Sequence, residues 1–558
     1  MIVASFAEVL SIGAVFPFLA ALTSPERLYS STSLAPVIQV MQIDSPQKLL
    51  LPLTVLFAGT ALIAGVMRIL LLKISTSLSF EIGADISMGI YERTLHQPYT
   101  VHISRSSSEV INGISGKTSS VIYNVITPSL TLLSSAVMLF AILLVLLLIN
   151  PLVAILSFAT FGLLYSVIVG YSRKKLSVYS DSVAKESTRV IKLLQDGLGG
   201  IRDILLDGSQ KTYCDVYRDA DRFLRNSQAK ITFIAQSPRY AMEAIGMMLI
   251  ALLAFMMTSQ SEGGVATAIP IIGALALGAQ RLLPVLQQAF NSWACILGSQ
   301  SSLEDTLNLL DQPLPELENR LIVNPITFNE KIRLNQIYFK YSEDLPTVLK
   351  NLSLEIPKGS RVGFIGTTGS GKSTLLDILM GLLIADTGTL EVDGKIISKR
   401  NQHFWQAHIA HVPQAIFLSD STIEENIAFG IPLNEIDHSR VIYAANQAQI
   451  SDLIDSLPLQ YKTLVGERGV RLSGGQRQRI GIARALYKQA DVIVFDEATS
   501  ALDNETENEV MQAIESLSDR LTIIMVAHRL STLRSCNKIV ELGNGGVVKV
   551  GTYQEMIS

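Results

Sequence analysis

A chain of 558 residues is long enough for more than one domain, and 48% of its residues are hydrophobic while only 17% are charged. This balance is typical of a membrane protein, and a net charge of −4 argues against nucleic acid as a partner. The three cysteines, Cys214, Cys295 and Cys536, are widely separated and form no CxxC pair, so they predict neither a disulfide framework nor a metal site.

Apolar stretches long enough to cross a bilayer, which needs about 20 residues per helix, recur along the N-terminal half of the chain. The clearest, LTLLSSAVMLFAILLVLLLIN, contains no charged residue. The sequence therefore predicts an α-helical transmembrane domain over residues 1–310. Its six spans are expected at about 2–22, 50–73, 126–149, 151–171, 240–258 and 265–290.

The positions of basic residues predict which segments face the cytoplasm, because cytoplasmic loops carry an excess of lysine and arginine. The turns at 150–151 and 259–264 contain none, whereas the connection between the fourth and fifth spans is rich in them. Segments 74–125 and 172–239 are therefore predicted to be cytoplasmic, as are both termini. Both segments are polar and helix-patterned, so we expect them to extend the membrane helices into the cytosol.

The C-terminal part of the chain has the pattern of a soluble domain. The stretch DQPLPELENR has the proline and acidic content of a linker, which we place at 311–325. After it, short apolar runs alternate with helical patterns, as is typical of an α/β domain with a parallel sheet. The predicted fold class is thus a helical membrane domain followed by an α/β domain over 326–558.

The strongest motif in that domain is GTTGSGKST, which fits the phosphate-binding pattern G-x-x-x-x-G-K-[ST]. It lies between a predicted strand, RVGFIG, and an apolar helix, TLLDILMGLL, the context that such a loop requires. Lys372 is expected to reach the outer phosphates of ATP, and Ser373 to bind Mg²⁺. The predicted ATP-binding residues of this P-loop are Gly366, Thr367, Thr368, Gly369, Ser370, Gly371, Lys372, Ser373 and Thr374.

A second motif, DVIVFDE at 491–497, has the pattern of a buried strand that ends in two acids. Asp496 is expected to hold Mg²⁺ through water, and Glu497 to polarise the water that attacks the outer phosphate. The alternative is that both are solvated acids at the end of a strand.

Between these motifs lies RLSGGQRQR, which resembles the signature of ABC ATPases. The resemblance extends from about residue 326 to the end of the chain and includes the sequences HVPQ, GERG, SALD and VAHR. It implies that Tyr341 stacks on adenine and that Gln414 contacts Mg²⁺. It implies catalytic roles for Lys372, Gln414, Glu497 and His528. It implies nucleotide-binding roles for Ser473, Gly474, Gly475, Gln476 and Asp503.

The resemblance also implies how two such domains work together. They face each other head to tail, so each ATP lies between Lys372 of one domain and Ser473–Gly475 of the other. Because the chain has one set of six spans and one ATPase domain, it resembles a half-transporter that dimerises, most simply with itself. Its implied location is the bacterial inner membrane, with the ATPase domain in the cytoplasm and with ATP and Mg²⁺ as cofactors.

Six spans followed by an ATPase domain resemble ABC exporters. In that architecture, two cytoplasmic loops press short coupling helices onto the ATPase domains. Segments 96–110 and 194–208 are placed to do so. The alternative is that these segments are only helix–turn connectors.

Within the exporters, the membrane half is most similar to lipid-linked oligosaccharide flippases, through SFAEVLSIGAVFPFL, GVMRILL, SPRYAMEAIG and RLLPV. The implied cargo is an anionic membrane lipid, a polyprenyl pyrophosphate that carries sugars, moved from the inner to the outer leaflet. An exporter of another lipid, a drug or a peptide is the first alternative. An ATP-gated channel or regulator is the second, and the intact Glu497 and His528 argue against it.

Three arginines lie within or beside the predicted spans, where a central charge costs about 2.5–3.5 kcal/mol on insertion scales. Arg68 and Arg281 come late in inward-running spans and Arg239 at the start of an outward-running one, so all three are expected in the cytoplasmic half. In a homodimer they would form a basic ring suited to binding a pyrophosphate. Alternatively, Arg239 pairs with Glu243, and Arg68 pairs with Glu8 or reaches lipid headgroups.

Overall fold

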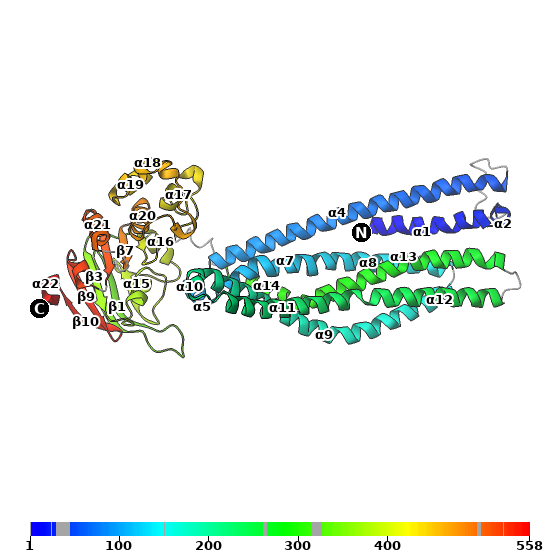
Figure 1. Ribbon diagram of the computed structural model, residues 1–558, viewed down its shortest axis with the longest axis horizontal. Helices are drawn as coiled ribbons and strands as arrows, with labels where there is room; N and C mark the ends of the chain where they lie inside the picture. Colours follow the sequence, from blue (N-terminus) through cyan, green and yellow to red (C-terminus); the bar gives the residue numbers. More distant parts are fainter. Residues whose placement is uncertain are drawn as a thin grey trace. The chain divides into compact units, whose positions relative to one another are not determined.

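The chain forms two compact units, one comprising Met1–Gln97 and Arg105–Leu314, the other Pro98–Ser104 and Pro315–Ser558. In the described residues the first unit is helical, and the second contains the strands (Figure 1). Some side chains within the membrane helices are not described. The structure is a computed structural model that describes residues 2–23, 25–29, 45–149, 151–260, 265–314, 326–498, 504–527 and 529–557.

Helices of the first unit cover all six predicted spans and confirm the helical membrane domain. Three of them continue well past the predicted span: α4 has 46 residues, α9 has 49 and α13 has 34. The expected extension of membrane helices beyond the apolar stretches is therefore present. The six helices are α1 (Ile2–Thr23), α4 (Leu50–Leu95), α8 (Thr127–Ile149), α9 (Pro151–Gly199), α12 (Pro238–Gln260) and α13 (Val265–Gly298).

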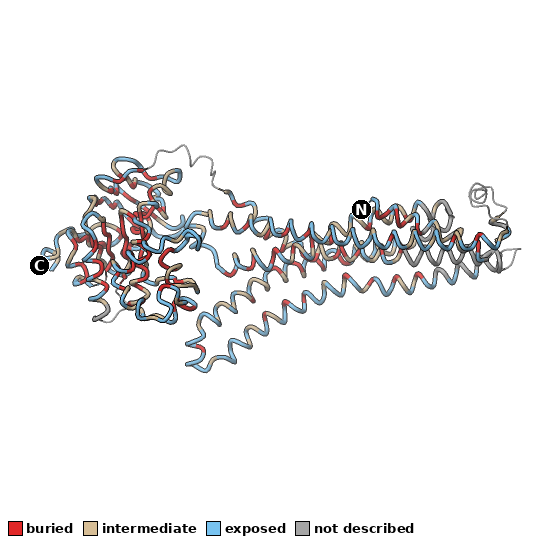
Figure 2. Tube along the Cα trace, turned by 90° about the horizontal axis from the view of Figure 1, so that it is seen from above, coloured by how far each residue is buried: buried red, intermediate tan, exposed pale blue. Residues whose placement is uncertain are grey.

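Apolar surface is extensive in the first unit. By length and composition alone, two helical stretches within the described residues could cross a membrane, Pro46–Leu95 and Ser107–Leu144. Large apolar side chains such as Ile69, Leu72 and Leu163 are exposed on α4 and α9. Figure 2 shows buried residues sparsely along these helices and densely in the other unit. Such surface is unfavourable in water and is expected to face lipid.

The described parts of the two long segments between the membrane helices, 96–126 and 200–237, are also mainly helical. Short helices occur in both segments predicted to couple the domains, α5 (Tyr99–Ser104) and α10 (Ile201–Asp207). α10 is capped by Gly208, whose φ of 61° favours glycine after a helix C-terminus. The other helices of the first unit are α2 (Pro25–Tyr29), η1 (Pro46–Leu49), α6 (Ser107–Ile111), η2 (Asn112–Lys117), α7 (Thr118–Val121), η3 (Ile122–Ile126), α11 (Gln210–Gln236) and α14 (Gln300–Leu310).

Four of the long helices share a small core. α8 packs against α13, α9 against α11, and α12 against α13. Apolar side chains from α8, α9, α12 and α13 form one buried cluster at this junction. Its members are Ile142, Phe161, Met242, Leu282 and Val285.

The second unit contains a six-stranded sheet of order β10-β9-β3-β8-β7-β6 and a four-stranded sheet of order β2-β1-β4-β5. In the first sheet only the β9–β10 pair is antiparallel, which confirms the predicted parallel sheet. The second sheet is antiparallel and was not predicted. The strands are β1 (Lys331–Phe339), β2 (Leu349–Pro357), β3 (Arg361–Gly366), β4 (Thr387–Val392), β5 (Lys395–Ile396), β6 (Ile409–Val412), β7 (Val492–Asp496), β8 (Thr522–Val526), β9 (Lys538–Gly543) and β10 (Gly546–Gly551).

Two apolar cores include strands of the parallel sheet. One core contains Phe364 with residues of α15 and Trp405. The other contains Phe495 with residues of α20 and α21. Val494 belongs to the first core and its neighbour Phe495 to the second, because side chains alternate between the faces of a strand. The helices are α15 (Lys372–Leu379), α16 (Gln402–Ala407), α17 (Ile423–Ile427), η5 (Leu433–Glu435), α18 (His438–Gln447), α19 (Ser451–Ser456), η6 (Gln460–Lys462), η7 (Glu467–Gly469), α20 (Gly474–Tyr487), α21 (Asn504–Glu515), η8 (Leu530–Leu533) and α22 (Tyr553–Ile557).

Candidate functional site

The predicted P-loop lies at the carboxyl edge of the parallel sheet. β3 ends at Gly366 and α15 begins at Lys372, as the strand–loop–helix pattern predicts. Gly369 and Gly371 have φ angles of 82° and 95°, which L side chains rarely adopt. A Cβ atom on Gly366 would lie 2.4 Å from the carbonyl oxygen of Leu542, so only glycine fits there. The loop's N–H groups and the start of α15 are suited to binding phosphate.

Lys372 is held inside this loop. Its side chain is only 7% exposed, and Nζ donates to the carbonyl oxygens of Gly366 at 2.8 Å and Thr367 at 3.1 Å. A phosphate oxygen in the loop can replace these carbonyls as the partner of the ammonium group. The lysine is therefore positioned for the role that its sequence motif predicts.

The remaining side chains of the loop divide by exposure. Thr368 and Ser373 are exposed, whereas Ser370 and Thr374 are buried. The hydroxyl of Tyr341 forms a hydrogen bond with that of Thr374 at 3.0 Å. This bond brings the residue predicted to stack on adenine next to the P-loop.

The two acids of the second motif lie at the end of β7, at the same edge of the sheet. Glu497 has a φ of 50°, and its N–H donates to the carbonyl oxygen of Val526 at 3.1 Å. Holding a non-glycine residue in this left-handed backbone conformation costs about 1–3 kcal/mol, and such residues cluster at functional sites. Gln414 is exposed two residues after β6, the strand beside β7. Parallel strands thus bring Gln414, Asp496, Glu497 and the P-loop to one edge.

The signature motif begins a helix. Ser473 is the N-cap of α20: its hydroxyl accepts from the N–H of Gln476 at 3.3 Å, while Gln476 Oε1 accepts from the N–H of Ser473 at 2.8 Å. This reciprocal cap orders the first turn, which includes Gly474 and Gly475. Ser473 is exposed, so an anion bound to another domain can approach the positive N-terminal end of α20.

One acid beside this site was not predicted as part of it. Asp377 lies on α15, about one turn beyond the P-loop. Burial, and to a smaller extent the nearby Asp496 carboxylate, together raise the pKa of its carboxyl to about 6. The signal in the sequence is an acid within the apolar helix TLLDILMGLL. The charge on Asp377 therefore costs stability at neutral pH.

Replacing Asp377 by Asn is expected to stabilise the protein at pH 7.5 and clearly less at pH 5. Because folding raises this pKa from 3.8 to about 6, the folded state binds the proton more tightly, and stability falls as pH rises through about 6. The carboxyl is only partly buried, so we expect a gain of about 1 kcal/mol in the free energy of unfolding at pH 7.5. Thermal unfolding without nucleotide measures this gain, and a gain independent of pH would contradict the cause given.

Three predicted residues are not placed. Asp503 lies outside the described residues, directly before α21, and so does His528, two residues after β8. The side chain of Arg281, on α13, is also outside the described part of the structure.

The other two membrane arginines are both paired with acids. Arg68 on α4 forms an ion pair with Glu8 on α1, and the Glu8 side chain is 1% exposed while that of Arg68 is 46% exposed. Arg239 Nε lies 3.0 Å from Glu243 Oε1 on the same helix, α12, and the Arg239 side chain is largely exposed while that of Glu243 is partly buried. Both alternative pairings suggested by the sequence are therefore present, and both guanidinium groups keep accessible surface.

Comparison with known families identifies both units. Residues 349–500 match the ABC transporter family, and residues 10–280 match the ABC transporter transmembrane region. The two matches together span more than half of the chain. The chain belongs to the ABC transporter family.

Relatives of this ABC transporter include proteins named ATP-dependent lipid A-core flippase. The one from Chromohalobacter salexigens is 31% identical over 401 residues, 71% of this chain and 67% of the relative. The one from Legionella pneumophila is 32% identical over 396 residues, 70% of this chain and 66% of the relative. Leukotoxin translocation ATP-binding protein LktB of Mannheimia haemolytica is 38% identical over 283 residues, 50% of this chain but 39% of its own length.

Among solved structures, a bacterial Atm1-family ABC exporter with ATP bound has the same fold. The TM-score is 0.77 at 22% sequence identity, covering 98% of this chain and 95% of that one. This likeness confirms the predicted exporter architecture. The family matches and the ATP-dependent relatives show an ABC exporter whose cytoplasmic ATPase domain binds and hydrolyses ATP to drive transport across the bacterial inner membrane.

Proposed function

We propose that this ABC exporter flips an anionic lipid that carries sugars, of the polyprenyl pyrophosphate type, from the inner to the outer leaflet. The observation that carries the proposal is the exposed surface of two paired membrane arginines, 46% for Arg68 and 61% for Arg239. Each guanidinium has five N–H donors, so it can bind phosphate oxygens while still paired with a carboxylate. The names of the flippase relatives support a lipid cargo.

In the ATPase domain, the chain's own oxygen atoms suit Mg²⁺. Ser373, Gln414 and Asp496 offer a hydroxyl, an amide and a carboxylate oxygen at one edge of the sheet, and Mg²⁺ prefers oxygen ligands. Bound Mg²⁺ supplies positive charge against the phosphates. Lys372 binds the outer phosphates, Tyr341 stacks on adenine, and the P-loop N–H groups orient the triphosphate of ATP.

Glu497 polarises the attacking water, and His528 and Gln414 assist in placing it against the outer phosphate. We propose that the signature residues of a second copy complete the site, because the capped N-terminus of α20 presents Ser473 to the outside. The residues that the second copy contributes to the site also include Gly474, Gly475, Gln476 and Asp503. The result is a homodimer with two head-to-tail ATP sites, both able to hydrolyse.

Transport requires that the two domains, with proposed boundaries at 1–310 and 326–558, respond to each other. We assign this coupling to segments 96–110 and 194–208, which contain α5 and α10. In the membrane domain, Arg281 completes the basic ring with Arg68 and Arg239. The anionic headgroup is bound by the ring, and closure of the ATP sites drives its movement.

Replacing Arg68, Arg239 and Arg281 together by Ala is expected to reduce lipid-stimulated ATPase activity to background. Glu8→Gln accompanies the change, because a buried carboxylate without its cation would destabilise the fold. ATPase assays in lipid nanodiscs, with mass spectrometry of co-purifying lipids, measure the effect. The control is Arg225→Ala with Asp221→Asn, which removes an i,i+4 ion pair from α11, outside the predicted spans.

The wild type is expected to retain a polyprenyl pyrophosphate that the arginine variant has lost. Undiminished lipid stimulation in the variant would contradict the proposal. If both proteins retain only bulk phospholipid, the arginines are better explained as helix anchors, and drugs and peptides become the cargoes to test.

A further inference from the structure

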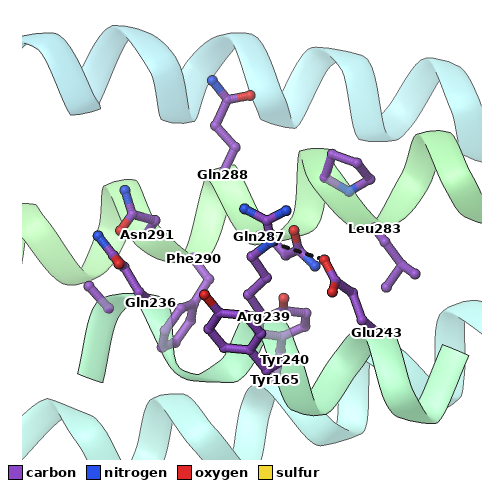
Figure 3. A pocket seen from close by; sticks show the side chains of 12 residues that line it. Tyr165, Gln236, Arg239, Tyr240, Glu243, Leu283, Gln287, Gln288, Phe290 and Asn291 are labelled. Atoms are coloured by element: carbon purple, nitrogen blue, oxygen red, sulfur yellow. Dashed lines mark hydrogen bonds and ion pairs between the residues drawn. The ribbon is translucent and has the colours of Figure 1, made fainter. Parts of the chain in front are cut away.

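A polar cavity of about 610 Å³ lies in the first unit, between α9, α11, α12 and α13 (Figure 3). Its volume falls within the range of small-molecule sites, about 300–1,000 Å³. Amide and hydroxyl side chains supply most of its polar lining. They are Tyr165, Gln236, Tyr240, Gln287, Gln288 and Asn291.

Two of these groups are buried without a protein partner. The Tyr165 hydroxyl and Gln287 Nε2 are inaccessible to solvent and form no hydrogen bond within the described part of the chain. Native proteins satisfy nearly all buried polar atoms, because an unmet donor costs about 1–3 kcal/mol. The Tyr165 ring packs on Phe290, with 5.5 Å between ring centroids, and Phe290 belongs to a buried cluster. The ring is thus held in place at the cavity wall, and its hydroxyl has an unmet hydrogen bond.

Among the described residues, the charges that line the cavity balance. Arg239 and Glu243 both line it and form an ion pair with Nε and Oε1 3.0 Å apart. No other charged side chain lines the cavity in the described part of the structure. The Glu243 carboxylate offsets the charge of Arg239, so these two side chains leave the cavity wall able to hold an uncharged polar group.

The lining instead suits a group rich in hydroxyls. A glutamine or asparagine amide both donates and accepts, as each sugar hydroxyl does, so pairs of neighbouring hydroxyls can be matched by amides. Tyr240 is 71% exposed beside these amides and offers an aromatic face to the C–H side of a sugar ring. The neutral charge and the mixed donors and acceptors together indicate a saccharide.

We propose that this cavity is a subsite for an uncharged sugar residue of a lipid-borne saccharide, recognised by Tyr165 and Gln287. The proposal rests on the proposed function for the lipid to which the sugar is attached. It separates two tasks in the membrane domain: the basic ring binds the anionic group, and the cavity binds the sugar. Arg239, paired with Glu243, lies where the two tasks meet.

The test compares two lipid probes in phosphatidylcholine nanodiscs. One is the uncharged glycolipid diglucosyl diacylglycerol, and the other is anionic, sugar-free phosphatidylglycerol. Binding is measured as radiolabelled lipid retained per chain. The Tyr165→Phe/Gln287→Met double variant is expected to bind the glycolipid about tenfold more weakly and phosphatidylglycerol as the wild type does. Tyr171→Phe, which removes a hydroxyl from the exposed surface of α9, is the matched control.

Folding of the double variant is not expected to fail, because both changes replace polar groups that have no partner by apolar ones of similar size. An unchanged or raised unfolding temperature checks this. Equal glycolipid binding by wild type, double variant and control would overturn the subsite. Selective loss of the glycolipid in the double variant, with phosphatidylglycerol binding unaffected by Arg68→Ala/Glu8→Gln, would uphold the subsite and reject the arginines of the proposed function.

Discussion

Replacing Glu497 by Gln is expected to lower the rate of ATP hydrolysis about a thousandfold while ATP still binds. A glutamine has the same shape but cannot polarise the attacking water, and a positioned base contributes about 10²–10⁴ in rate. The backbone supports this assignment, because Glu497 is held at a φ of 50° by its hydrogen bond to Val526. Phosphate release and equilibrium ATP binding, measured on the same preparation, separate the two effects.

A matched control for this prediction is Glu355→Gln on β2. Glu355 pairs with Arg333 and Lys331 on the neighbouring strand β1, so the change removes a carboxylate from outside the proposed site. The control should hydrolyse ATP at the wild-type rate. Substantial hydrolysis by the Glu497→Gln variant would remove Glu497 from its proposed role. It would favour the alternative that the two acids are solvated at the end of a strand.

Replacing Lys372 by Ala is expected to weaken ATP binding about a hundredfold or more. Hydrogen bonds between a charged donor and a charged acceptor contribute about 1.5–3 kcal/mol, and Lys372 is placed to donate at least one to the outer phosphates. The side chain is buried in the loop, so no other cation from solvent takes its position. Fluorescent nucleotide titration measures the dissociation constant directly.

The control for this prediction is Lys399→Ala, which removes an exposed lysine from the turn after β5. It should bind ATP as the wild type does. Wild-type affinity in the Lys372→Ala variant would show that the P-loop backbone alone holds the phosphates. Because Nζ also holds the Gly366 and Thr367 carbonyls, the unfolding temperature of the variant is measured alongside.

Features that depend on near neighbours in the chain were determined by the sequence itself. The P-loop is one: glycine tolerates the left-handed φ of Gly369 and Gly371, and the flanking strand and helix follow from local patterns. The six membrane spans follow from apolar stretches of about 20 residues. The Arg239–Glu243 pair could also be predicted from the sequence, because residues four apart share one face of a helix.

Features that depend on which segments pack together were decided only by the tertiary structure. The sequence offered Glu8 or lipid headgroups as partners of Arg68, and the packing of α1 on α4 decided for Glu8, 60 positions away. The raised pKa of Asp377 comes from burial, which other segments of the domain create. The cavity at Tyr165 and Gln287 exists only where α9, α11, α12 and α13 meet. Burial and contact arise from the whole fold. Periodicity shows which face of a segment is apolar, but it does not show which other segment will pack against that face.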